Sequence, residues 1–342
     1  MLRGVWLTYR MHRFEVLLSL VLLGVLAISV WIVTAHIRAA AFSASCWLTD
    51  SDGNLLKPGC GALMDRYSAI ATSEAGPARA GLALVVPVVG LILGVPVVAR
   101  ELELRTASLA WSLSLRRGRW LLSRLLPMLA LVLVGAIVIG WLGAGLFQAM
   151  EVGHLTPSLS EVASYGPTLA ARGLMALGIA SLAGAVIGRT LPALLLAAMV
   201  VIAWSVVAVP MVQGVLSESR ALWVNQGDEQ NGVGYIARVD YGEFDPSRPG
   251  VNGEPGARFD PDERYRLQVA ACGSAPADGT PELQVWSVCA DRVPAPMDES
   301  WDKVVPQSRY PDYQLTELGL EGVIGGAALL LTFPVVARRR PA

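Results

Sequence analysis

Long apolar runs alternate with short arginine-bearing connections along most of this chain. A hydrocarbon core about 30 Å thick needs roughly 20 consecutive apolar residues in a helix, because backbone polar groups find no water there. The sequence predicts six such helices, at 14–35, 80–99, 121–148, 168–188, 191–213 and 318–337. We therefore expect an all-α polytopic membrane protein with six transmembrane helices.

The composition agrees with a protein whose solvent is the bilayer. Of the 342 residues, 54% are hydrophobic and only 16% are charged, and the mean hydropathy is +0.50. An ordinary soluble domain of this length is more polar. The first apolar run is too long for the core of a signal peptide and has no clear cleavage site, so we expect it to be a retained helix.

The distribution of arginine predicts the orientation, because cytoplasmic connections of membrane proteins carry an excess of Lys and Arg. Four segments fit this rule: the start of the chain, the connection 100–120, the tight turn at 188–192 and the C-terminal tail. Counted with those close to the helix ends, their arginines are Arg3, Arg10, Arg13, Arg100, Arg105, Arg116, Arg117, Arg119, Arg124, Arg189, Arg338, Arg339 and Arg340. We expect a multi-pass protein of the cell membrane with both termini in the cytoplasm.

The connections 37–79, 151–167 and 215–317 then lie outside the cytoplasm. They contain all four cysteines, Cys46, Cys60, Cys272 and Cys289, and disulfides persist only outside the reducing cytoplasm. Four cysteines allow three pairings. The simplest pairs Cys46 with Cys60 and Cys272 with Cys289, and a bridge between the two loops remains an alternative.

The segment 215–317 is acidic and rich in Gly, Pro and Asp, and it contains strand-like runs at 233–241, 265–271 and 283–289. We predict a small β-containing extracytoplasmic domain between the fifth and sixth helices. The expected organisation is therefore 1–214 for the first five helices, 215–317 for the outer domain, and 318–342 for the sixth helix and a basic tail.

Residues that would mark an enzyme are missing from the sequence. No glycine-rich phosphate loop precedes either lysine, Lys57 or Lys303, and the three histidines have no metal-ligand spacing. We expect no catalytic site, no metal and no cofactor in this chain, and no nucleic-acid partner. Any nucleotide must be bound by another chain.

The connection between the second and third helices is the most informative stretch. Leu102, Thr106, Leu109 and Leu113 share one face at helical spacing, and arginines follow, which is typical of an amphipathic docking element with a basic end. An ordinary loop whose arginines fix the topology explains the charges as well. The two acids, Glu101 and Glu103, favour the docking element, because beside a membrane they need arginine partners in this protein or on a docked subunit.

This stretch resembles the ABC-2 permeases, in particular a bacterial group with the pattern Gly-x-Pro-x-x-Ala-Arg-Glu-x-Glu-x-Gly-Thr, then Ser/Thr-Gln-Ser and Arg-x-Arg-Trp. Arg105 replaces the glycine and Leu113 the glutamine. The matching residues are Gly94, Pro96, Ala99, Arg100, Glu101, Glu103, Thr106, Ser112, Ser114, Arg117, Arg119 and Trp120. The six-helix layout fits the family more loosely.

The resemblance implies the permease subunit of an ABC exporter that moves an amphipathic or apolar compound, such as a drug, peptide or lipid, outward. It implies a homodimer of permeases in membrane lipid with two copies of a separate ATP-binding subunit, which would hold ATP and Mg²⁺. It also implies an ATPase-coupling element, formed by Arg100, Glu101, Glu103, Thr106, Arg116, Arg117, Arg119 and Trp120.

Arg172 and Glu321 are the two charges inside the outer ends of the expected fourth and sixth helices. They could pair across helices and line a substrate path. A structural or snorkelling role is favoured at this shallow depth, so they are weak candidates.

Two other functions fit parts of the sequence. A membrane receptor or scaffold would use the acidic outer segment to sense a ligand and the arginine-rich connection to signal. A lipid-modifying enzyme ranks last, because it needs convergent catalytic groups at one membrane depth.

Overall fold

The structure, a computed structural model, describes residues 10, 12–40, 46–50, 53–56, 59–104, 117–151, 166–220, 222–225, 235–244, 258–259, 269–274, 300–306 and 310–338. The chain divides into two compact units. One combines Met1–Leu216 with Tyr310–Ala342 and is a helical bundle, and the other is Ser217–Arg309.

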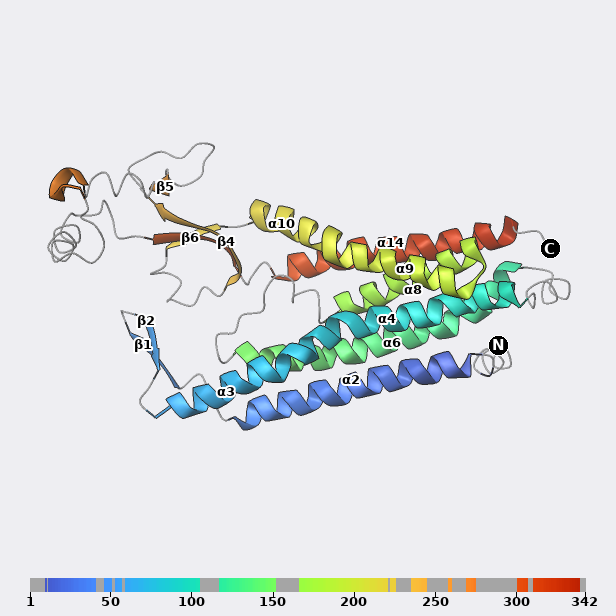
Figure 1. The fold of residues 1–342 in the computed structure, drawn as a ribbon, viewed down its shortest axis with the longest axis horizontal. Coiled ribbons are helices and arrows are strands. Elements are labelled where there is room, and N and C mark those ends of the chain that lie inside the picture. Colours follow the sequence, from blue (N-terminus) through green and yellow to red (C-terminus); the bar gives the residue numbers. More distant parts are fainter. Residues whose placement is uncertain are drawn as a thin grey trace. The chain divides into compact units, whose positions relative to one another are not determined.

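In the part of the chain that the structure describes, the helical bundle has six helices long and apolar enough to span a membrane, which agrees with the number expected. Their elements are α2 (Arg13–Ala39), α3 (Gly61–Ser73) followed by α4 (Ala75–Glu103), α6 (Arg117–Glu151), α8 (Thr168–Ile187), α9 (Thr190–Ala203) continued by η2 (Trp204–Ala208) and α10 (Val209–Arg220), and α14 (Tyr310–Arg338) (Figure 1). The protein is therefore a multi-pass membrane protein.

Helix α8 lies at the centre of the bundle and packs against both α4 and α14. Its sequence is rich in glycine and alanine, and such small residues let backbones of membrane helices approach closely. A Cβ atom on Gly94 of α4 would lie 2.7 Å from the carbonyl oxygen of Leu177 of α8. A Cβ on Gly178 of α8 would overlap the carbonyl oxygen of Gly325 of α14. Only glycine fits at these two contacts.

The faces of α2 and of α9–α10 that point away from the bundle are apolar and exposed. Trp31 of α2, Met199 of α9 and Met211 of α10 are among the exposed large side chains. In a bilayer such faces contact lipid tails, which are as apolar as the side chains themselves.

The turn between α8 and α9 has the geometry that its sequence predicts. Gly188 follows α8 with φ at +70°, in the left-handed region that glycine adopts without steric cost, and its N–H donates to Gly184 O at 2.9 Å. Pro192 then lies in the first turn of α9, where a backbone donor is not needed.

The fifth span contains a π-helical segment that the hydrophobic pattern did not predict. Residues Trp204–Ala208 form η2 between α9 and α10. Pro210 lacks an N–H, and its ring would clash with the carbonyl group four residues earlier in a regular helix, which belongs to Val206. A wider turn at this place relieves that clash.

Two boundaries differ from the expectation. The connection 37–79 is helical at its start and over its second half, since α2 continues to Ala39 and α3 and α4 begin at Gly61 and Ala75. The last helix begins at Tyr310 rather than at residue 318. The added turns are more polar than the apolar runs, so a hydropathy criterion makes these helices too short.

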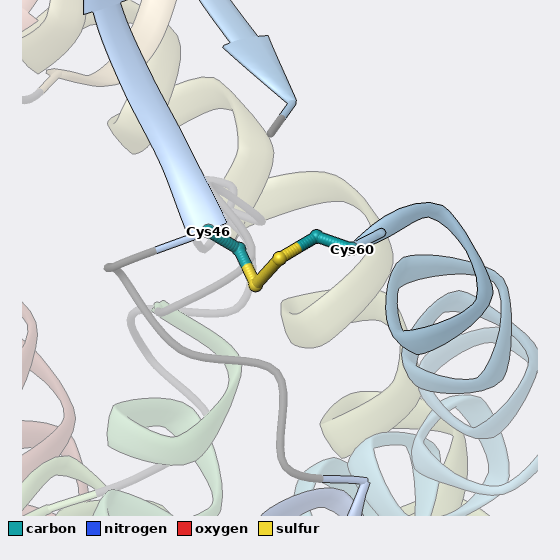
Figure 2. The surroundings of a disulfide bond; sticks show 2 residues. All are labelled: Cys46 and Cys60. Carbon is teal, nitrogen blue, oxygen red and sulfur yellow. A yellow bond between two sulfur atoms is a disulfide. The ribbon is translucent and has the colours of Figure 1, made fainter. Parts of the chain in front are cut away.

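The first connection also holds a short hairpin and a disulfide. Strands β1 (Trp47–Asp50) and β2 (Gly53–Leu56) pair antiparallel. Cys46 and Cys60 flank the hairpin and are bonded, with an S–S distance of 2.09 Å and Cα atoms 5.8 Å apart (Figure 2). The predicted Cys46–Cys60 pairing is thus confirmed.

The unit Ser217–Arg309 contains four strands in its described part: β3 (Leu222–Asn225), β4 (Tyr235–Phe244), β5 (Arg258–Phe259) and β6 (Ser300–Pro306). They form an antiparallel sheet in the order β3-β6-β4-β5. Strand β4 overlaps the predicted run 233–241. Of the predicted run 265–271, residues 269–271 are described and are helical, so the strand prediction is wrong for them. The run 283–289 lies outside the described residues. Cys272 is disulfide-bonded, and its expected partner, Cys289, is also outside them.

Candidate functional site

One end of the helical bundle gathers those arginines of the four segments that the structure describes, namely Arg10, Arg13, Arg100, Arg117, Arg119, Arg189 and Arg338. We call this the arginine-rich end and define it by the start of α2, the end of α4, the start of α6, the start of α9 and the end of α14. Two contacts tie these ends together. Arg100 Nη1 lies 2.6 Å from Glu15 Oε1 of α2, and Arg117 Nη1 donates to Ala337 O of α14 at 2.9 Å.

Glu101 is buried inside this end and pairs with Arg124. It lies near the end of α4 with only 3% of its surface exposed, and its Oε1 is 3.4 Å from Arg124 Nε of α6. A buried carboxylate needs a charged or hydrogen-bonding partner. Glu101 therefore holds α4 to α6 from within the bundle and offers little surface to a docked subunit.

Glu103, two residues later, is exposed and caps another helix. Its Oε2 accepts hydrogen bonds from Thr190 N at 3.0 Å and from Thr190 Oγ1 at 2.8 Å. Thr190 is the first residue of α9. The first N–H groups of a helix lack partners within the helix, and the helix dipole favours a negative charge there. The end of α4 is thereby joined to the start of α9.

His12, just before α2, is buried beside these groups. Burial disfavours the imidazolium form and lowers the pKa of His12, and the nearby Arg124 and Arg100 act in the same direction, while Glu15 opposes them. The neutral imidazole is therefore the favoured form at neutral pH.

The expected coupling residues are only partly described. Arg100, Glu101 and Glu103 end α4, whereas Arg117, Arg119 and Trp120 begin α6. Arg119 is exposed and Trp120 is buried. Thr106 and Arg116 lie outside the described residues, as does most of the amphipathic segment. The structure thus brings together the two helix ends that flank it.

This arrangement makes a junction of three helices. The segment 105–116 is covalently attached to α4 and α6, Glu101 and Arg124 fasten those two helices to each other, and Glu103 adds α9.

A second polar cluster lies at the other end of the bundle, and it contains the two weak candidates. Arg172 Nε of α8 is 3.0 Å from Glu321 Oε1 of α14, and both side chains are buried. The two residues thus pair across helices, as the sequence allowed, and their burial in an ion pair is compatible with the structural role. Because α14 begins at Tyr310, Glu321 lies about three turns into the helix rather than one.

Three further residues complete this cluster and were missed from the sequence. Arg172 Nη2 lies 3.8 Å from Glu317 Oε2, and Gln213 Nε2 of α10 donates to Glu317 Oε1 at 2.6 Å. Trp204 of η2 lines a small cavity together with Glu317 and Glu321. The spacing of the two glutamates by four residues, one helical turn, was the available signal.

A comparison with protein-family models decides the family. The model described as ABC-2 membrane transporter related matches residues 21–213, which is more than half of the chain. The chain belongs to this family. The resemblance found in the stretch 94–120 is confirmed. No curated protein and no solved structure matches the chain.

The matched range of this ABC-2-related transporter runs from α2 to α10. It includes the Glu101–Arg124 and Glu103–Thr190 contacts and Arg172, but not Glu317 and Glu321 on α14. The protein is thus a membrane transport component of the permease type.

Proposed function

We propose that this chain is the permease subunit of an ATP-driven exporter and that a separate ABC ATPase subunit docks at its arginine-rich end. The junction of α4, α6 and α9 carries the proposal, because a partner that moves the segment 105–116 would act on three helices together. The ATPase would bind ATP and Mg²⁺, and this chain would bind neither.

The proposed orientation places the arginine-rich end in the cytoplasm, where an ATPase finds ATP. Two independent observations support it. The arginine excess at this end follows the positive-inside rule, and the Cys46–Cys60 disulfide belongs to an oxidising compartment. In this orientation the unit Ser217–Arg309 would be a small β-containing extracytoplasmic domain.

The proposed assembly contains two permease copies and two ATPase copies in a bacterial cell membrane. The exposed apolar faces of α2 and of α9–α10 are supporting observations, because either could contact a second copy or lipid. An amphipathic or apolar substrate, such as a drug, peptide or lipid, suits a path lined by generic apolar side chains.

The experiment is to express this chain together with the ATPase encoded beside it and to purify through a tag on this chain alone. ATP hydrolysis is then measured in lipid nanodiscs. A stoichiometric complex that hydrolyses ATP supports the exporter. A chain that purifies without any ATPase would favour a receptor or scaffold instead.

A further inference from the structure

Among the described residues, the cluster around Arg172 contains more acids than bases. Two carboxylates, Glu317 and Glu321, face a single guanidinium, and all three side chains are at most 9% exposed. The other groups acting on the glutamates from α10 and η2, Gln213 and Trp204, are uncharged. If both glutamates were ionised, the buried cluster would have a net charge of about −1.

The two carboxylates also have more acceptor oxygens than hydrogen bonds to satisfy them. Gln213 and Arg172 supply donors to Glu317 Oε1 and Glu321 Oε1. The remaining oxygens, Glu317 Oε2 and Glu321 Oε2, are buried and accept no hydrogen bond within normal geometry from the described residues. The Trp204 indole is the uncharged donor that acts on Glu321. Both glutamates lie on one face of α14, one turn apart, where two negative charges repel each other. An uncompensated buried carboxylate costs several kcal/mol.

The surroundings of these oxygens select the ligand. The cavity beside them is lined otherwise by Trp204, Val209, Val212 and Leu320. A Na⁺, Ca²⁺ or Mg²⁺ ion needs several oxygen ligands at once, and apolar walls supply none. A proton needs a single carboxylate oxygen, removes the excess charge and creates the donor that the cluster lacks.

We propose that Glu317 and Glu321 form a binding site for one proton, which the pair shares and retains at neutral pH. Binding adds H⁺ from water to a carboxylate oxygen and forms one O–H bond, with no electron transfer. The site joins α8 to α14 and, through Gln213, to α10. Because α10 runs into the unit Ser217–Arg309 and α14 follows it in the chain, proton release would change the charge beside the two helices that flank this unit in the sequence.

Infrared spectroscopy of the full-length protein in nanodiscs tests this site, because a protonated carboxyl group has a C=O stretching band that an ionised one lacks. The wild type is compared at neutral pH with E317Q, with E321Q and with D65N, a control at an exposed acid of α3. We expect the wild type and D65N to share a protonated-carboxyl band. Each of E317Q and E321Q should lose it, because either change leaves one carboxylate for one guanidinium.

The band of the wild type should also disappear on alkaline titration in a single step that corresponds to one proton per chain. This second measurement needs no variant, so it stands even where a glutamine variant fails to insert. A wild type without the band at neutral pH, or a band that persists in both E317Q and E321Q, would overturn the proposal. Both results are independent of any ATPase partner.

Discussion

The Glu103 carboxylate, at the end of α4, accepts two hydrogen bonds from Thr190, the first residue of α9. Glutamate at this position was expected from the family pattern, but its partner was expected among arginines. The contact instead satisfies a backbone N–H group at a helix start. It connects the segment that we propose as the docking element to the least buried span of the bundle.

Loss of this connection should uncouple the ATPase from the permease. We expect E103A and T190V each to reduce the permease-dependent stimulation of ATP hydrolysis several-fold, while E103Q, which keeps an acceptor oxygen, has a smaller effect. ATP hydrolysis in nanodiscs and complex recovery are measured in parallel. Equal stimulation in wild type, E103A and T190V would contradict a coupling role.

Glu101 should behave differently, because its side chain is buried. E101A removes the buried carboxylate beside the Arg124 guanidinium, and breaking a buried pair from one side costs about 3 kcal/mol. We expect a lower thermal-unfolding midpoint for E101A. The double variant E101L/R124M, which replaces the pair by apolar side chains of similar size, should recover most of the loss. A double variant as unstable as E101A would show that the ion pair is not the cause.

The sequence predicted the six spans and the family, because hydrophobic length and the 94–120 pattern are local signals. It missed the extent of α4 and α14, whose outer turns are polar and are stabilised by packing. It allowed for the pair of Arg172 and Glu321 but missed Glu317 as a second partner of Arg172, and it did not identify Arg124 as the arginine that meets Glu101. These residues meet across helices that are distant in sequence. Such pairs depend on helix rotation and depth, which a hydropathy pattern does not specify.

The close contact between α8 and α14 predicts a strong size limit at Gly178. In G178A the new methyl group would overlap the Gly325 backbone, and overpacking of this kind costs about 1–3 kcal/mol. The control is G326A on α14, where a Cβ has nothing within 4 Å. We expect the thermal-unfolding midpoint to fall for G178A and to stay unchanged or rise for G326A. Similar midpoints for the two variants would contradict the packing.

The buried His12 should make the folded protein less stable at acidic pH. Its pKa is lowered in the folded protein, mainly by burial, so the unfolded chain binds a proton at a higher pH than the folded one does. The stabilisation is complete above the unfolded pKa of about 6.5 and is lost as the pH falls through the folded pKa. We expect the unfolding midpoint to decrease below that pH and the decrease to be smaller in H12Q. An undiminished slope in H12Q would exclude His12 as its origin.

Two leucines of similar exposure, at opposite ends of the bundle, allow a direct test of ATPase docking at the arginine-rich end. Leu104 follows α4 and is 62% exposed, while Leu315 lies near the start of α14, at the opposite end of the bundle, and is 66% exposed. A photo-cross-linking amino acid is placed at either position, and the chain is co-expressed with the neighbouring ATPase and illuminated in membranes. We expect a covalent permease–ATPase product from position 104 and none from position 315. Cross-linking from position 315 alone, or from neither position in a complex that copurifies, would contradict docking at the arginine-rich end.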